Sequence, residues 1–158
     1  MSSLTLLRKG RLGSGSHSHE KGQALIEFAF VVPLLFLLIL LVVDFGIALD
    51  RRELTQHAVR EGARRAAVGD TIAEIRDVTH NQSGGTLQVD DINVCYWDTN
   101  GNLTADAGEN VRVSGDYTFR FSVGGGEMLA AFGVHPSIEM NPSANERLEM
   151  TAAIPDRC

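Results

Sequence analysis

Hydrophobic positions are concentrated in one block near the N-terminus. The sixteen residues from Phe28 to Val43 carry no charge, and apolar character resumes from Phe45 to Leu49. As an α-helix, such a block spans only about 24 Å. A bilayer core of about 30 Å needs roughly 20 residues. A membrane-crossing helix over residues 23–49 must therefore bring Glu27 or Asp44 to the edge of the hydrocarbon.

Small and apolar residues continue to recur at spacings near three and four beyond this block, a pattern typical of one helix face. They are Leu54, Ala58, Gly62, Ala66, Ile72 and Ile75. Glycine costs about 1 kcal/mol relative to alanine inside a helix, so Gly62 suggests close packing against another element. We expect the helix to continue outside the membrane from Asp50 to about Asp77, within a segment covering residues 50–80.

The pattern changes after the glycine-rich break Asn81–Gly85. Four stretches rich in β-forming residues follow: Thr86–Val89, Ile92–Trp97, Val111–Val123 and Ser137–Met140. In the longest, apolar residues are mostly spaced by two, as in a half-buried strand. Turn-forming Asp98–Asn102 links two strands, and Glu127–Phe132 predicts a short helical turn. The predicted fold class is α+β: a long N-terminal membrane-spanning helix continuing into a small antiparallel sheet domain, residues 81–158.

The distribution of charge narrows the functional classes. The chain has 14 basic and 20 acidic residues and a net charge of -6. Residues 1–22 carry +3, residues 23–49 carry -2 and residues 50–158 carry -7. The lack of a basic face argues against nucleic-acid binding. The single apolar block near the N-terminus argues against a soluble enzyme with one large core.

Two ordinary classes of apolar N-terminal segment are alternatives for this block. A secretory signal peptide could be cut near Gly46–Ala48, but its apolar region is shorter than this block, and Asp44 would precede the cut. An ordinary signal anchor fits the length. Charge does not settle orientation, because four Lys or Arg residues precede the helix and five follow closely.

A short motif, Gly22–Phe28, lies directly before the apolar block and behind a hydrophilic, basic leader. It resembles a prepilin cleavage site. Together with Pro33, Val43–Gly46 and Ala58–Ala67, it resembles the TadE-like family, the minor pseudopilins of tight-adherence (Flp) pilus systems. One departure is Ile47, which stands where an arginine is expected in this family.

The resemblance implies that prepilin peptidase removes a leader of residues 1–22 by cutting after Gly22, on the cytoplasmic side. Gln23 then gains a free α-ammonium four residues before Glu27, on the same side of the helix. The resemblance further implies that Glu27 of an incoming subunit neutralises this amine on a neighbour. Glu27, Phe28, Pro33 and Asp44 are the residues we expect to act in assembly.

Asp44 has no partner that the sequence makes obvious. Arg51 and Arg52 follow seven and eight residues later and could reach back along the same side of the helix. The alternative is a carboxylate that lies at the level of the outer headgroups.

An acidic loop has part of the spacing of a calcium-binding loop. Asp98, Asn100, Asn102, Asp106 and Glu109 occupy its positions 1, 3, 5, 9 and 12. The sixth position needs glycine for a sharp turn but holds Leu103, and no helices are expected on either side. These residues are weak calcium candidates. A solvated hairpin loop is the expected structure, and no metal site is predicted.

Cys95 and Cys158 are the only cysteines. In an exported domain they could form a disulfide between a strand and the C-terminal tail, and such a bridge would stabilise the fold by about 3 to 4 kcal/mol. Sequence spacing leaves free thiols as the alternative.

Catalytic motifs are not found in the sequence: it has no nucleophile elbow, phosphate-binding loop or His-Glu-x-x-His, and we expect neither enzyme activity nor a cofactor. The main hypothesis is a single-pass pseudopilin with its N-terminus inside and its C-terminal domain extracytoplasmic. Its expected partners are prepilin peptidase, other pilin or pseudopilin subunits and the pilus assembly platform. The alternative is a membrane-anchored extracytoplasmic binding module that never enters a filament.

Overall fold

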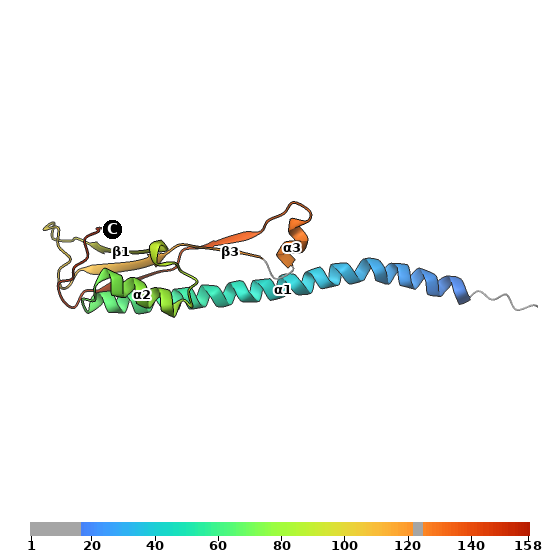
Figure 1. Ribbon diagram of the computed structural model, residues 1–158, viewed down its shortest axis with the longest axis horizontal. Helices are drawn as coiled ribbons and strands as arrows, with labels where there is room; N and C mark the ends of the chain where they lie inside the picture. The colour runs from blue at the N-terminus through green and yellow to red at the C-terminus, as the bar shows by residue number, and fades with distance from the viewer. Residues whose placement is uncertain (1–16, 122–124) are drawn as a thin grey trace, which may run out of the picture. The chain divides into compact units, whose positions relative to one another are not determined.

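The computed structural model describes residues 17–121 and 125–158, and its fold is α+β, as predicted (Figure 1). The described residues divide into two compact units between Phe36 and Leu37, and the first helix contributes to both. The elements in chain order are α1 (His17–Ala67), α2 (Ile72–Gln82), the 3-10 turn η1 (Val89–Asp91), β1 (Ile92–Trp97), β2 (Asn110–Gly115), β3 (Tyr117–Arg120), α3 (Gly125–Ala130), β4 (Ser137–Met140) and β5 (Ser143–Arg147).

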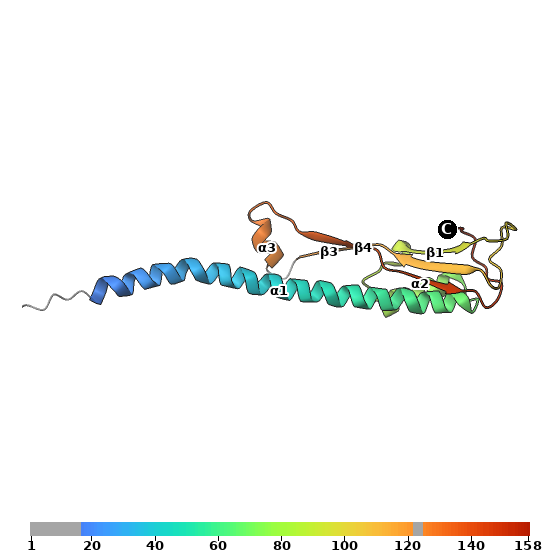
Figure 2. The ribbon, with the colours of Figure 1, turned by 180° about the vertical axis from the view of Figure 1, so that it is seen from behind.

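The strands form two small antiparallel sheets. The larger has the order β1-β2-β5, with Val113 of β2 opposite Val94 of β1 and Ala144 of β5. The smaller consists of β3 and β4, with Phe119 opposite Ile138. Seen from either side, the β3–β4 pair lies further along α1 toward its N-terminus than the larger sheet (Figures 1 and 2).

The main core lies between the larger sheet, α2 and the C-terminal part of α1. On α1, Val59, Ala63 and Ala66 are fully buried. These small side chains let the helix approach the sheet closely. The rest of the core includes Ile75, Leu87, Ile92, Val94, Tyr96, Ala105, Val111, Val113, Leu148 and Ile154. At Gly62 the approach is closest, because a Cβ there would lie 2.2 Å from Thr79 Oγ1 of α2.

A second, smaller cluster joins α1 to the β3–β4 pair. Ala48 of α1 is buried against Phe119 and Met140. The rings of Phe119 and Phe121 meet edge to face with centroids 5.3 Å apart, an arrangement that aromatic pairs favour.

The prediction of one helix from Asp50 to about Asp77 is wrong at its C-terminal part. α1 ends at Ala67, and Gly69 takes a positive φ of 87° that suits glycine. Thr71 then caps α2 through a capping box with Glu74. The helical spacing of apolar residues continues through the turn because both helices face one core. Ile75 of α2 is buried in the same core as the small residues of α1.

The strand predictions for Ile92–Trp97 and Ser137–Met140 are confirmed, as is the break after Gln82. The long predicted strand Val111–Val123 is instead divided between two sheets. The chain leaves the larger sheet at Asp116, whose N–H donates to the Asp91 carbonyl at 3.3 Å.

The predicted strand Thr86–Val89 is wrong, because side chains at the C-terminal end of α2 bind the backbone of Leu87 in place of a neighbouring strand. The N–H of Leu87 donates to Ser83 Oγ at 3.0 Å, and its carbonyl oxygen lies 2.7 Å from His80 Nδ1. The sequence does not predict strand β5. It is an edge strand on which only Ala144 is half buried, so it has no alternation of apolar and polar residues. The short helix α3 begins and ends two residues earlier than the predicted turn at Glu127–Phe132.

Candidate functional site

The domain contacts α1 in an ordered series that begins at Asp44. Asp44 bonds to Gly126 of α3, and Ala48 packs on the β3–β4 pair. Further along, Gln56 Nε2 donates to the Ser143 carbonyl at 3.0 Å. The series ends where the N–H of Glu149 donates to the Ala67 carbonyl at 2.8 Å. By contrast, no residue from Gly22 to Val43 is buried.

The uncovered part of α1 is an apolar surface. Phe28, Phe30 and Leu34 expose 66%, 78% and 67% of their surfaces. Each large apolar side chain left in water instead of an apolar environment costs about 1.5 to 3 kcal/mol. As a helix, Gln23 to Val43 measures about 32 Å, which matches the bilayer core. By length and composition, α1 is able to cross a membrane, and within the described residues it is the one helix that is.

The predicted processing and assembly residues lie at the start of this surface. Gln23 Nε2 donates to Glu27 Oε1 at 3.1 Å, so the two residues face the same side of α1, as their spacing predicts. The bond between Gly22 and Gln23 lies within α1, which begins at His17, and α1 passes through Pro33 without ending. The leader residues Arg8, Lys9 and Arg11 lie outside the described part of the chain.

Asp44 lies at the other end of the apolar surface and is fully buried. Its Oδ2 accepts a hydrogen bond from the Gly126 N–H at 3.2 Å. A Cβ at Gly126 would lie 1.7 Å from the Phe121 carbonyl oxygen, so this close approach requires glycine. Sequence reasoning missed this partner. Of the two arginines it suggested, Arg51 donates to Thr86 Oγ1 at 3.1 Å.

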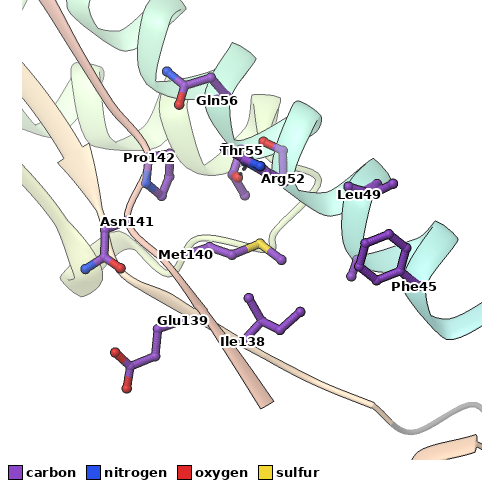
Figure 3. Close-up of a pocket in the computed structure, with 11 residues that line it drawn as sticks. Phe45, Leu49, Arg52, Thr55, Gln56, Ile138, Glu139, Met140, Asn141 and Pro142 are labelled. Carbon is purple, nitrogen blue, oxygen red and sulfur yellow. Dashed lines mark hydrogen bonds between the residues drawn. The ribbon is translucent and has the colours of Figure 1, made fainter. Parts of the chain in front are cut away.

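A groove of about 330 Å³ lies between α1 and β4, next to the end of the apolar surface (Figure 3). Phe45 and Leu49 line its α1 side and remain half exposed. On the β4 side, Met140 points toward α1 and Glu139 points away (Figure 3). The groove therefore offers partly exposed apolar side chains just beyond the uncovered segment of α1.

The acidic loop forms the connection between β1 and β2. Asp98 accepts from the N–H groups of Gly101 and Leu103 and pairs with Arg157 at 3.2 Å. Burial acts to raise the pKa of Asp98, but these three donors together hold that pKa below its ordinary value. Leu103 occupies the position for which a calcium loop needs glycine, and its φ is positive at 66°.

The other carboxylates of the loop are also held by protein donors. Glu109 accepts from the Thr99 N–H at 2.7 Å and from the Asp106 N–H at 3.1 Å. Burial acts to raise the Glu109 pKa, but these bonds lower it overall. Bonds from Asn102 and Asn100 lower the pKa of Asp106. Within the described residues, no group of three or more His, Cys, Asp or Glu side chains could hold a metal ion.

Cys95 and Cys158 are joined by a disulfide, with their Cα atoms 5.1 Å apart. The tail lies along β1 beside it: the Tyr96 N–H donates to the Asp156 carbonyl at 3.0 Å, and the Cys158 N–H donates to the Tyr96 carbonyl at 2.9 Å. The bridge and these bonds fasten the C-terminal tail to the edge of the larger sheet.

Comparison with known families adds one finding to this geometry. A family model described as TadE-like protein matches residues 22–64. These residues form a TadE-like segment. The resemblance seen in the sequence is thereby confirmed over about a quarter of the chain. No curated protein and no solved structure gave a match.

The TadE-like segment coincides with the structural features described above. It begins at Gly22, includes the whole uncovered surface of α1 and ends three residues before Ala67. Glu27 and Asp44 both lie within it. The match likens this segment to TadE-like proteins, and the helix that carries the segment has the length and composition to cross a membrane once.

Proposed function

We propose that the protein is a minor pilin-like subunit, a pseudopilin, that takes part in assembly of a tight-adherence pilus. Prepilin peptidase cuts it after Gly22. Its N-terminus faces the cytoplasm, and its domain lies outside the membrane. The observation that carries this proposal is an uncovered apolar helix with Glu27 just after a prepilin-type site, all inside the TadE-like segment.

Helix-to-helix association is the proposed mode of action. The apolar side chains from Phe28 to Val43 need a non-aqueous environment, which lipid supplies before assembly and neighbouring helices supply afterwards. Pilin and pseudopilin subunits and the assembly platform are the proposed partners. The groove beside Phe45 and Leu49 extends the contact surface beyond the membrane edge.

Glu27 sets the register of this association. Inside hydrocarbon, an unpaired carboxylate costs a few kcal/mol. In the uncleaved chain its neighbour is the Gln23 amide. Cleavage gives Gln23 a positively charged α-ammonium group. Glu27 of an arriving subunit then pairs with the Gln23 α-ammonium of the subunit assembled before it. Such a pair favours one axial position over others even where its net energy is small.

Two experiments test the proposal. Mass spectrometry of the membrane-extracted protein should find a mature chain beginning at Gln23. An intact Met1 start would refute the processing step and favour the alternative, a membrane-anchored extracytoplasmic binding module. Cleavage near Ala48 would refute both readings, because it would remove the apolar surface of α1.

The second experiment replaces the carboxylate. Glu27→Ala should leave processing largely intact but weaken co-purification with other pilus subunits by about tenfold, the effect of losing about 1.4 kcal/mol. Glu53→Ala is the matched control, because Glu53 is an exposed glutamate of α1 beyond the apolar segment. Equal incorporation of the Glu27→Ala and Glu53→Ala chains would refute the pairing role.

A further inference from the structure

The turn after α3 carries apolar side chains that the domain does not cover. We call residues Met128–Val134 the α3 turn. Phe132 exposes 82% of its surface and Val134 exposes 49%. No residue of the α3 turn is charged, although residues 50–158 as a whole carry a net charge of -7. A single exposed apolar residue needs no explanation, but an uncharged apolar group on an acidic domain does.

The contacts of α3 with α1 fix where this turn lies along the helix. Gly126, at the start of α3, donates to Asp44, the first buried residue after the apolar segment. The next residues along α1, from Phe45 to Ala48, lie against the β3–β4 pair, with Ala48 buried against Met140 of β4. Of the elements packed on α1, α3 is therefore the one nearest the apolar segment, and Figures 1 and 2 show it at that end of the domain.

Asp44 also marks the edge of the hydrocarbon. Counted from Gln23, the helix has risen about 32 Å, the thickness of a bilayer core, when it reaches Val43, so the next residue lies at the outer interface. The carboxylate there accepts a hydrogen bond from the Gly126 N–H. Thus the hydrogen bond that holds α3 on α1 also holds the α3 turn at the level of the lipid headgroups.

We propose that the α3 turn is a second membrane contact, with Phe132 and Val134 inserted into the outer interface of the bilayer that α1 crosses. The occupant is a phospholipid surface, because the turn lies at the depth of that surface and none of its residues Met128–Val134 is charged; the exposed Glu127 precedes it, in the first turn of α3. Phenylalanine is among the side chains that interfacial helices bury at the boundary of headgroups and acyl chains. With two attachments, the tilt of the domain relative to the bilayer is restricted as well as its height.

This inference rests on the membrane-spanning part of the proposed function and is independent of prepilin processing. Tryptophan fluorescence tests it in the full chain, reconstituted in nanodiscs of phosphatidylcholine with brominated acyl chains, which quench tryptophan on contact. Trp97 is the only tryptophan and lies at the far end of β1, opposite Asn110. The wild-type chain therefore serves as the control for a position away from the membrane.

Reporter chains carry Trp97→Phe together with one new tryptophan. Phe132→Trp reports on the α3 turn, and Phe30→Trp reports on α1. We expect Phe132→Trp to lose emission and shift to shorter wavelength in brominated discs, while wild-type Trp97 keeps its emission. Val134→Trp is a second reporter on the same turn and is expected to behave alike, so the test does not depend on one variant folding.

The contrary outcomes are distinct. If Phe30→Trp is quenched but both turn reporters behave like Trp97, the α3 turn does not touch lipid and the inference falls, while the spanning helix stands. If Phe30→Trp is also unquenched, the spanning helix of the proposed function fails as well. A spectral shift that needs two copies in a disc and occurs without lipid quenching would assign the turn to a second subunit and overturn the inference.

Discussion

Substituting Gly62 by alanine tests the packing of α1 against α2 most directly. A Cβ at this position would lie 2.2 Å from Thr79 Oγ1 and 3.3 Å from a methyl group of Val113. Thr79 is fully buried and its hydroxyl donates to the Ile75 carbonyl at 2.8 Å, so it has little room to move. The added methyl group must therefore push α2 away from α1.

Two opposing effects decide the magnitude. Alanine gains about 1 kcal/mol over glycine inside a helix. Overpacking of a tight core costs typically 1 to 3 kcal/mol, and the 2.2 Å approach places Gly62→Ala at the upper end of that range. We expect a net loss of about 2 kcal/mol, which lowers the melting temperature by roughly 8 °C for a domain of this size.

Thermal unfolding of the full chain in detergent, followed by the near-ultraviolet circular dichroism of Trp97, measures this change. Adding Thr79→Ala removes the clashing oxygen and should recover most of the loss, whereas Thr79→Val keeps an atom of similar size there and should not. A Gly62→Ala chain that melts higher than wild type, or equal rescue by both second-site variants, would refute the packing argument.

Two further predictions concern the domain of residues 81–158. Reducing the Cys95–Cys158 disulfide, which closes a separation of 63 residues, should cost about 4 kcal/mol and lower the melting temperature; an unchanged melting curve in dithiothreitol contradicts it. The second concerns pH, because the carboxyls of Asp98, Asp106 and Glu109 have pKa values in the folded state below their ordinary ones. The stability that these carboxylates give the folded state is complete above their unfolded-state pKa values. It is lost as pH falls through their folded-state pKa values. Melting temperatures measured between pH 7 and pH 3 should be level above about pH 5 and fall below about pH 4.5; a level profile down to pH 3 contradicts this.

The features predicted best from the sequence depend on local pattern. The apolar block, the strand Ile92–Trp97 and the spacing of Gln23 and Glu27 each follow from periodicity within a few residues. The same reasoning failed at Gly69, because the residues on both sides of the turn face one core and keep a helical spacing through it. Periodicity reports which side is buried but does not show whether the chain has reversed direction.

The partner of Asp44 depends on tertiary structure and could not be found from spacing. Gly126 is 82 residues away and contributes only its backbone N–H, so it has no side chain that would mark it as a partner. The one available indication was the run Gly124–Gly126, since glycine is common where a backbone must approach another group closely. Similarly, Leu87 has an apolar side chain typical of a strand, but its backbone bonds to Ser83 and His80 instead.

In the proposed assembly, the ordered contacts between the domain and α1 would limit how far neighbouring subunits overlap along a shared axis. From Asp44 to Ala67, one face of the helix is occupied by the chain's own sheets and helices. A second helix can lie against that face only before Asp44, over about 32 Å of length. Two subunits packed in the proposed way could slide past each other only until the folded domain of one met the other, so the domain would set the largest possible stagger.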